Sequence, residues 1–195
     1  AYADTGAVVV LPHSGNWDMA GLWFVRHYGP FSTVVERVAP ERLYQRFVSY
    51  RASLGFDIVP LTGAGNPIPR LLRRLRSGGV VCLLADRDLT GAGVSVEFFG
   101  GIAKMPLGPA RLAAATGATL LVIGCWFTPG GWGIRFHPPV PVPDRSAVQQ
   151  ATQTVAGCFA TDIAAHPQDW HMLQPLWIED LPVTRLRDAR PQGPR

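Results

Sequence analysis

Lysine is almost absent from this chain, although its formal net charge is +4. Lys104 is the single lysine beside 17 arginines, and charged residues make up only 16% of the sequence. With 47% hydrophobic residues, the composition excludes a disordered chain and is typical of a globular domain. The basic balance favours anionic partners such as phosphates, a nucleotide-bearing donor or acidic lipid. No motif for nucleic-acid binding is present, so we expect no nucleic-acid partner.

Long apolar runs and cysteines are also scarce. No apolar run approaches the ~20 residues that span a bilayer, so the sequence predicts no transmembrane helix. The cysteines are Cys82, Cys125 and Cys158, an odd number in apolar surroundings. This favours reduced thiols in the core and a cytosolic setting. No cysteine and histidine cluster has zinc spacing, so no zinc site is expected.

Strand-like and helix-like segments alternate along the chain. Apolar runs predict strands at 7–11, 32–37, 57–61, 79–85, 94–98, 119–125 and 133–136. Helices are predicted at 16–28, 40–54, 67–76, 109–116 and 146–165. This order predicts an α/β fold with a central, mostly parallel sheet flanked by helices.

The domain organisation predicted from the sequence is simple. Residues 1–180 are expected to form a single domain, and residues 181–195, rich in proline and arginine, a flexible tail. The sequence begins with Ala1 rather than Met and enters a strand almost at once. We therefore expect a fragment or a processed form, from which an N-terminal segment is missing.

The predicted helix at 67–76 carries an apolar stripe and a basic face. Asn66 is expected as its N-cap and Pro67 as its first residue. The arginines lie largely off the stripe and are Arg70, Arg73, Arg74 and Arg76. This face is either simply solvated or meets anionic lipid, where each cation contributes about 1 kcal/mol.

His13 and Asp18 follow the first predicted strand, in LPHSGNWDMAG. Open α/β sheets place their chemistry at the carboxyl ends of strands. A histidine there is a candidate general base, and Asp18 is predicted to hold its ring and offset the charge that it gains. The alternative to a catalytic role is a histidine that ends the strand beside an aspartate exposed to solvent. The small polar turn that includes Asn16 lets another molecule approach, and the start of the next helix favours a developing oxyanion or a phosphate.

Asp86, Arg87 and Asp88 follow the apolar strand at 79–85. One interpretation places them in the crevice of His13, with Arg87 facing an anion. A second is a DxD metal site of the kind found in nucleotide-sugar glycosyltransferases. A third is a solvated turn. Arg51, in a predicted helix, is either a surface cation or a group that recognises phosphate or carboxylate.

Several blocks of the chain resemble the bacterial lipid A biosynthesis acyltransferase family, and most closely its branch of actinobacterial phosphatidylinositol mannoside acyltransferases. The blocks are HSGNWDMAG at 13–21, ERVAPERLYQRFVSYRASLG at 36–55, LLADRDLTGAGVSVEFFG at 83–100, MPLGPARLAAATGA at 105–118 and DWHMLQP at 169–175. The resemblance covers about residues 6 to 178. The family normally has helices before this point, and we expect that the present sequence does not include them.

The resemblance implies a glycerolipid-acyltransferase-like fold and a membrane-associated O-acyltransferase without a cofactor. The donor would be acyl-CoA, typically palmitoyl-CoA, and the acceptor a mannose hydroxyl of phosphatidylinositol mannosides. It also implies a peripheral enzyme on the cytoplasmic face of the plasma membrane, in contact with anionic lipid. The matching positions are His13, Asp18 and Asp86 as catalytic residues, and Asn16, Trp17, Glu36, Arg51 and Arg87 as substrate-binding residues.

The resemblance leaves three points to be settled: the mechanism, the acyl groove and the alternative functions. No serine or cysteine lies in a G-x-S-x-G elbow, so no acyl-enzyme is expected. The acyl chain needs an apolar groove, which Leu22, Trp23 and Phe24, or alternatively Phe98 and Phe99, are candidates to line. The rival functions are a lipid A-type enzyme that uses acyl carrier protein, a metal-dependent DxD glycosyltransferase and a non-catalytic lipid-binding protein.

Overall fold

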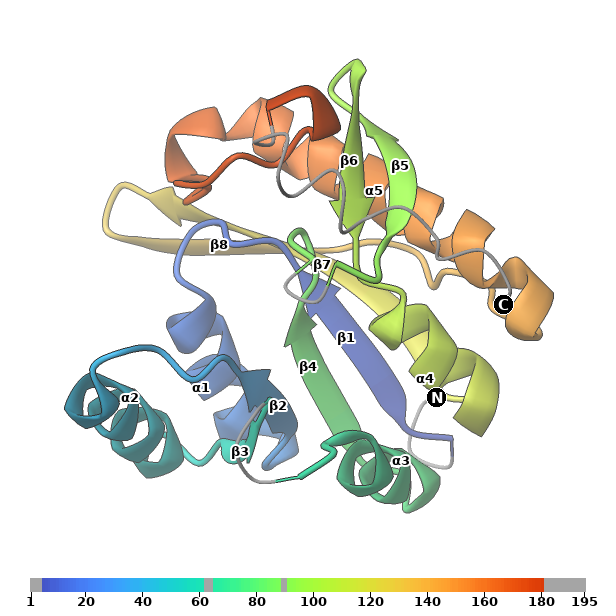
Figure 1. Cartoon of the computed structure of the whole chain (residues 1–195). Coiled ribbons are helices and arrows are strands. Elements are labelled where there is room, and N and C mark those ends of the chain that lie inside the picture. Colours follow the sequence, from blue (N-terminus) through green and yellow to red (C-terminus); the bar gives the residue numbers. More distant parts are fainter. Residues whose placement is uncertain (1–4, 62–64, 89–90, 181–195) are drawn as a thin grey trace.

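A six-stranded sheet forms the centre of the protein (Figure 1). The computed structural model describes residues 5–61, 65–88 and 91–180, so the predicted tail at 181–195 lies outside the described residues. The strands lie in the order β3-β2-β4-β1-β7-β8. Their bounds are β1 Ala7–Leu11, β2 Ser32–Val35, β3 Asp57–Pro60, β4 Val80–Leu84, β7 Thr119–Thr128 and β8 Gly131–Phe136.

The sheet is parallel except at one edge. Strands β1, β2, β3, β4 and β7 pair in parallel, whereas β8 returns antiparallel to β7 through a tight hairpin. Strand β1 is central, and all five of its residues are buried. The run of β-branched residues in β1 fits a parallel strand covered on both faces. The predicted α/β class with a mostly parallel sheet is therefore confirmed.

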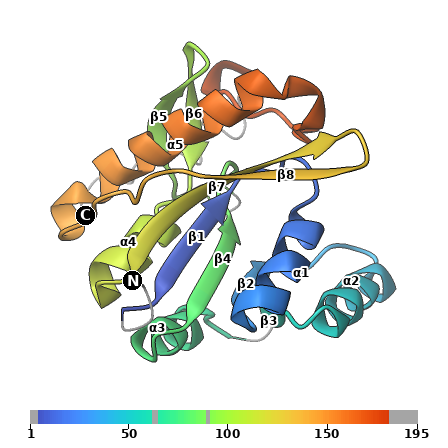
Figure 2. The same ribbon diagram turned by 180° about the vertical axis from the view of Figure 1, so that it is seen from behind.

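The helices divide between the two faces of the sheet, as the opposite views in Figures 1 and 2 show. Val8 and Val10 join a large core with residues of the helices on one face, and Ala7, Val9 and Leu11 join a smaller core with α1 on the other. This alternation follows from the period of two along a strand. The helices are α1 Trp17–Tyr28, α2 Glu41–Ser53, α3 Ile68–Arg76, α4 Gly108–Thr116 and α5 Val148–Ala165.

Strand β6 (Gly101–Met105) was not predicted. It pairs antiparallel with β5 (Val94–Phe98), which was predicted, in a separate two-stranded sheet. The sequence hides β6 because its buried residues are Ala103 and Met105, while the apolar Ile102 points outward and is 44% exposed. Lys104 is the single polar side chain of β6 and shares the outer face with Ile102, so the alternation typical of a half-buried strand is weak.

Helix α3 differs in detail from its prediction. The N-cap is Pro67 and not Asn66, so the helix starts one residue late; Asn66 still accepts a hydrogen bond from the backbone N–H of Ile68. The basic face is only partly solvated, because Arg70 pairs with Asp57 and Arg74 donates to the carbonyl of Pro30. Two of the four arginines thus tie α3 to the body of the protein.

Candidate active site

The turn after β1 places His13 at the carboxyl edge of the sheet. Gly15 has φ +60°, and a Cβ there would lie 2.7 Å from the backbone of Cys125 on β7. Only glycine fits this close approach in the left-handed region. Asn16 then caps α1, since its Oδ1 accepts a hydrogen bond of 3.0 Å from the N–H of Met19. The HSGN segment is therefore a tightly specified turn, and the His13 side chain remains 25% exposed.

The carboxylate that holds the His13 ring belongs to Asp86. Its Oδ1 lies 2.5 Å from Nδ1 of His13, and its Oδ2 accepts a hydrogen bond of 2.9 Å from the His13 backbone N–H. The strand register explains the pairing: Leu11 on β1 lies opposite Leu84 on β4, so the residues two positions further along meet. The expectation that Asp18 holds the ring is wrong in this structure.

Asp86 is fully buried and surrounded by N–H donors. Besides the two contacts with His13, its Oδ2 accepts a hydrogen bond of 3.0 Å from the indole Nε1–H of Trp170. These three contacts satisfy both oxygens of the buried carboxylate. Because Asp86 accepts at Nδ1, that ring nitrogen carries the proton and Nε2 presents its lone pair.

Asp18, on α1, instead forms an ion pair with Arg51, on α2. Oδ1 of Asp18 accepts a hydrogen bond of 2.8 Å from Nε of Arg51, and Oδ2 accepts one of 3.3 Å from Nη2. Both side chains are about four-fifths buried, at 22% and 19% exposed. A two-pronged contact of this kind holds the guanidinium in one orientation. Asp18 thus fixes the direction in which Arg51 points.

A second ion pair lies on the rim of the same crevice. Nη2 of Arg87, after β4, donates to Glu36, after β2, over 2.7 Å. Nε of Arg87 is buried and has no hydrogen-bond partner among the described residues. The prediction that Arg87 lies in the crevice of His13 is confirmed, but its partner in this structure is a carboxylate of the protein.

The geometry does not form a DxD metal site. Both oxygens of Asp86 are engaged by protein N–H groups, and Oδ2 of Asp88 accepts a hydrogen bond of 2.6 Å from Gly93. In the described part of the chain, no group of three or more histidine, cysteine or carboxylate side chains is placed to bind a metal ion.

Residues of the C-terminal segment complete the site, and the sequence alone did not identify them. Trp170 donates its indole Nε1–H to Asp86. His171 donates its backbone N–H to the carbonyl of His13 over 2.7 Å, and its ring lies edge-on to Trp17, which also contacts the His13 ring. The available signal was the DWHMLQP block, whose polar residues have no periodicity that would explain them by packing.

Two adjoining cavities meet at this site. The smaller, about 460 Å³, is lined by His13, Glu36, Arg51 and Arg87. The larger, about 730 Å³, extends along the face of the sheet beneath α1 and is mainly apolar. Some residues line both cavities, among them Trp17, Arg51 and Leu84.

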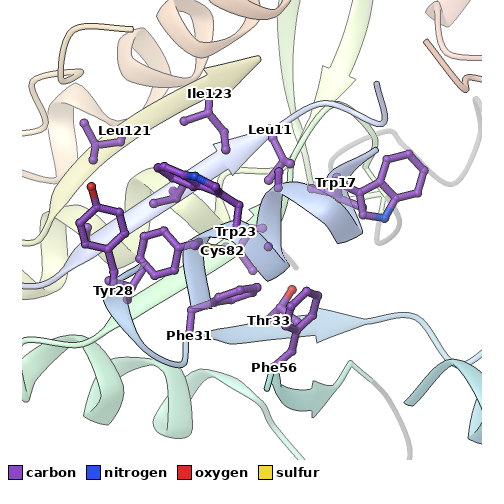
Figure 3. A pocket seen from close by; sticks show the side chains of 18 of the residues that line it. Leu11, Trp17, Trp23, Tyr28, Phe31, Thr33, Phe56, Cys82, Leu121 and Ile123 are labelled. Atoms are coloured by element: carbon purple, nitrogen blue, oxygen red, sulfur yellow. The ribbon is translucent and has the colours of Figure 1, made fainter. Parts of the chain in front are cut away.

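Figure 3 shows the larger cavity from close by. Trp17 and Leu11 lie at the end near His13, and Tyr28 and Leu121 lie at the opposite end. Of the residues considered for an acyl groove, Trp23 and Phe24 line this cavity. Phe98 instead lies in the large core, and Phe99 packs against Trp170.

Comparison with known proteins gives the class to which this arrangement belongs. The family model described as bacterial lipid A biosynthesis acyltransferase matches residues 2–179. The chain therefore belongs to this family, and the resemblance seen in its sequence blocks is confirmed.

Within the family, the chain is similar to mycobacterial proteins of one name. The chain is 53% identical to the phosphatidylinositol mannoside acyltransferase of Mycobacterium tuberculosis strain H37Rv over 189 residues, which is 96% of this chain and 60% of the relative. It is 54% identical over 180 residues to the protein of the same name from Mycolicibacterium smegmatis, covering 92% of this chain and 59% of the relative. The chain thus spans about three-fifths of the length of these relatives.

Proposed function

We propose that this chain is an O-acyltransferase that moves a palmitoyl group from acyl-CoA to a mannose hydroxyl of phosphatidylinositol mannosides. The observation that carries the proposal is the buried Asp86, which orients His13 where a polar crevice meets a long apolar cavity. The family membership and the names of the mycobacterial relatives support it. The working location we propose is the cytoplasmic face of the plasma membrane.

His13 acts as the general base. Nε2 has no partner among the described residues, and it takes the proton of the mannose hydroxyl as that oxygen attacks the thioester carbonyl. Asp86 keeps the ring in the productive tautomer and offsets its positive charge. When the C–S bond breaks, the proton passes from the ring to the departing sulfur, and coenzyme A leaves as a thiol.

The two cavities divide the substrates between them. The larger cavity offers an apolar wall along the whole of β1, from Leu11 near the catalytic turn to Ala7, and takes the acyl chain. The smaller cavity takes the polar groups of the acceptor and donor. There the Asp18–Arg51 pair holds a guanidinium toward an anionic group, and the Glu36–Arg87 pair offers both donors and acceptors to a sugar.

One assay tests the reaction. The chain is incubated with palmitoyl-CoA and a mannosylated phosphatidylinositol in the presence of a chelator, and free thiol and lipid mass are followed. We expect equal amounts of new thiol and acylated lipid. Activity that requires a divalent ion, or acyl transfer only from acyl carrier protein, would overturn the proposal in this form.

His13→Ala is the matched variant for this assay. We expect its turnover to fall by about 10²–10⁴-fold, the usual contribution of a general base. The change removes a partly exposed ring and leaves the backbone hydrogen bond to Asp86, so the thermal unfolding midpoint serves as the control for folding. Near-normal turnover in a folded variant would refute the assignment of the base.

A further inference from the structure

Helix α2 presents an apolar stripe to solvent. Leu43, Phe47 and Tyr50 follow each other at i, i+4 and i+7 and therefore share one face. They are 40%, 44% and 51% exposed, and Tyr44 is the one fully buried residue of the helix. Figures 1 and 2 both show α2 at the periphery of the molecule, next to β3. An apolar face of this kind usually meets a partner.

Basic side chains flank this stripe. Arg42 and Arg46 are exposed and lie on its border, one turn apart, and neither forms an ion pair within the described part of the chain. The acidic residue of the helix, Glu41, is paired with Arg37. An apolar face bordered by unpaired arginines is complementary to an anionic lipid surface, where the acyl region and the headgroups lie in adjacent layers.

The stripe is continuous with the mouth of the smaller cavity. Phe47 belongs to the stripe and also lines the cavity that contains His13. Tyr44 and Val48, on the inner side of the same helix, line it as well. A surface that binds the stripe therefore lies at the cavity that His13 lines.

We propose that the Leu43–Phe47–Tyr50 stripe of α2, with Arg42 and Arg46, is the surface with which this protein docks on an anionic bilayer. None of the helices in the described ranges is both long and apolar enough to cross a membrane. The consequence for catalysis rests on the proposed function. A lipid acceptor held in the bilayer would present its headgroup to the smaller cavity without leaving the membrane.

The charge pattern favours a bilayer over a second copy of the chain. Two copies joined through this face would bring the four arginines at positions 42 and 46 close together without acidic partners, which costs energy. Helix α3 is a weaker candidate for the same role. Two of its arginines are engaged with the body of the protein, and the remaining Arg73 and Arg76 border no exposed apolar stripe on that helix.

Co-sedimentation with vesicles tests the docking surface without any reaction. The vesicles contain phosphatidylcholine alone or with one-third phosphatidylglycerol. We expect the wild-type chain to bind the anionic vesicles. Binding should fall about twentyfold or more in Arg42→Glu/Arg46→Glu, since each cation near the surface contributes about fivefold. Leu43→Ser/Tyr50→Ser should lose binding to a similar extent. None of these four residues lines either cavity.

Matched controls remove similar groups elsewhere. Trp132→Ser/Leu173→Ser removes exposed apolar surface away from α2, and Arg73→Glu/Arg76→Glu reverses charge on α3. Both should bind like wild type. The proposal is overturned if the wild-type chain does not bind anionic vesicles, or if the α2 variants bind as the controls do. It is also overturned if the α2 variants convert a dimer into a monomer in gel filtration and leave vesicle binding unchanged.

Acyl transfer to an acceptor in detergent micelles separates this proposal from the proposed function. The α2 variants should keep transfer in micelles and lose it on vesicles. If the wild-type chain binds vesicles but transfers no acyl group, the docking surface is supported and the proposed function is refuted. If it transfers acyl groups in micelles but does not bind vesicles, the proposed function is supported and the docking surface is refuted.

Discussion

Nδ1 of His13 lies 2.5 Å from Oδ1 of Asp86, although 73 residues separate them in the chain. The aspartate five positions after the histidine, Asp18, lies instead against Arg51. This arrangement separates two roles that the sequence spacing assigns to one residue. Asp86 holds the ring that we propose as the base, and Asp18 holds the guanidinium of Arg51.

The first prediction compares the two aspartates. Asp86→Asn keeps the size of the side chain but removes the charge that fixes the tautomer of His13, so we expect kcat to fall by about 10³–10⁴-fold with little change in KM. Asp18→Asn should reduce kcat by far less. Steady-state kinetics with palmitoyl-CoA measure both, with the unfolding midpoint as a control. Equal losses of kcat in the two variants would contradict the division of roles.

The second prediction concerns the Asp18–Arg51 pair. A hydrogen bond to a charged group contributes about 1.5–3 kcal/mol. Arg51→Ala removes the contact of Arg51 with an anionic group of the substrate, and Asp18→Ala releases Arg51 from its orientation, so each variant should raise KM by about tenfold or more. If the two act as a unit, the double variant is no worse than Arg51→Ala alone. A double-mutant cycle in KM measures the coupling. Strictly additive effects would show that Asp18 does not act through Arg51.

The third prediction shortens the larger cavity. Val80 lines it at the end away from His13 and is partly exposed to it, so phenylalanine can extend into open space there. Each methylene left unburied costs about 0.8 kcal/mol, and displacing two or three should lower kcat/KM for palmitoyl-CoA by about 10- to 50-fold. Transfer from decanoyl-CoA serves as the internal control and should be nearly unchanged. A uniform loss at all chain lengths would place the acyl chain elsewhere.

The fourth prediction follows from the buried thiols. Burial raises the pKa of Cys125 to about 12 and raises the pKa of Cys82 well above its ordinary value of 9.0. Above pH 9 the unfolded chain loses these protons and the folded chain keeps them, so the free energy of unfolding falls as pH rises. The expected loss is about 1.4 kcal/mol per pH unit for each thiol, from pH 9 towards pH 12.

Urea unfolding at pH 8, 9 and 10 measures this slope. Cys82→Ala/Cys125→Ala should be less stable at pH 8, because it loses packing, but should show a flatter decline above pH 9. The groups that the two proteins share contribute to both curves, so the comparison isolates the two thiols. Parallel curves for the two proteins would show that the thiols titrate alike in the folded and unfolded states.

The sequence by itself determined the α/β class, nearly every strand and α-helix, and the location of the turn that carries His13. These features depend on local patterns: an unbroken apolar strand, a helix cap at Asn16, and a polar turn that ends the first strand. It also identified three polar residues that line the crevice, His13, Glu36 and Arg87, because polar groups that follow parallel strands gather at one edge of the sheet.

Only the tertiary structure decided which of these residues are partners. The choice between Asp18 and Asp86 depends on the register of β1 against β4, where Leu11 lies opposite Leu84. That register is set by packing between segments distant in the chain, and no local spacing encodes it. The same holds for Trp170, which reaches Asp86 across 84 positions, and for the exposed face of α2. A local pattern predicts that a helix has an apolar face, but the surrounding fold decides whether that face is covered.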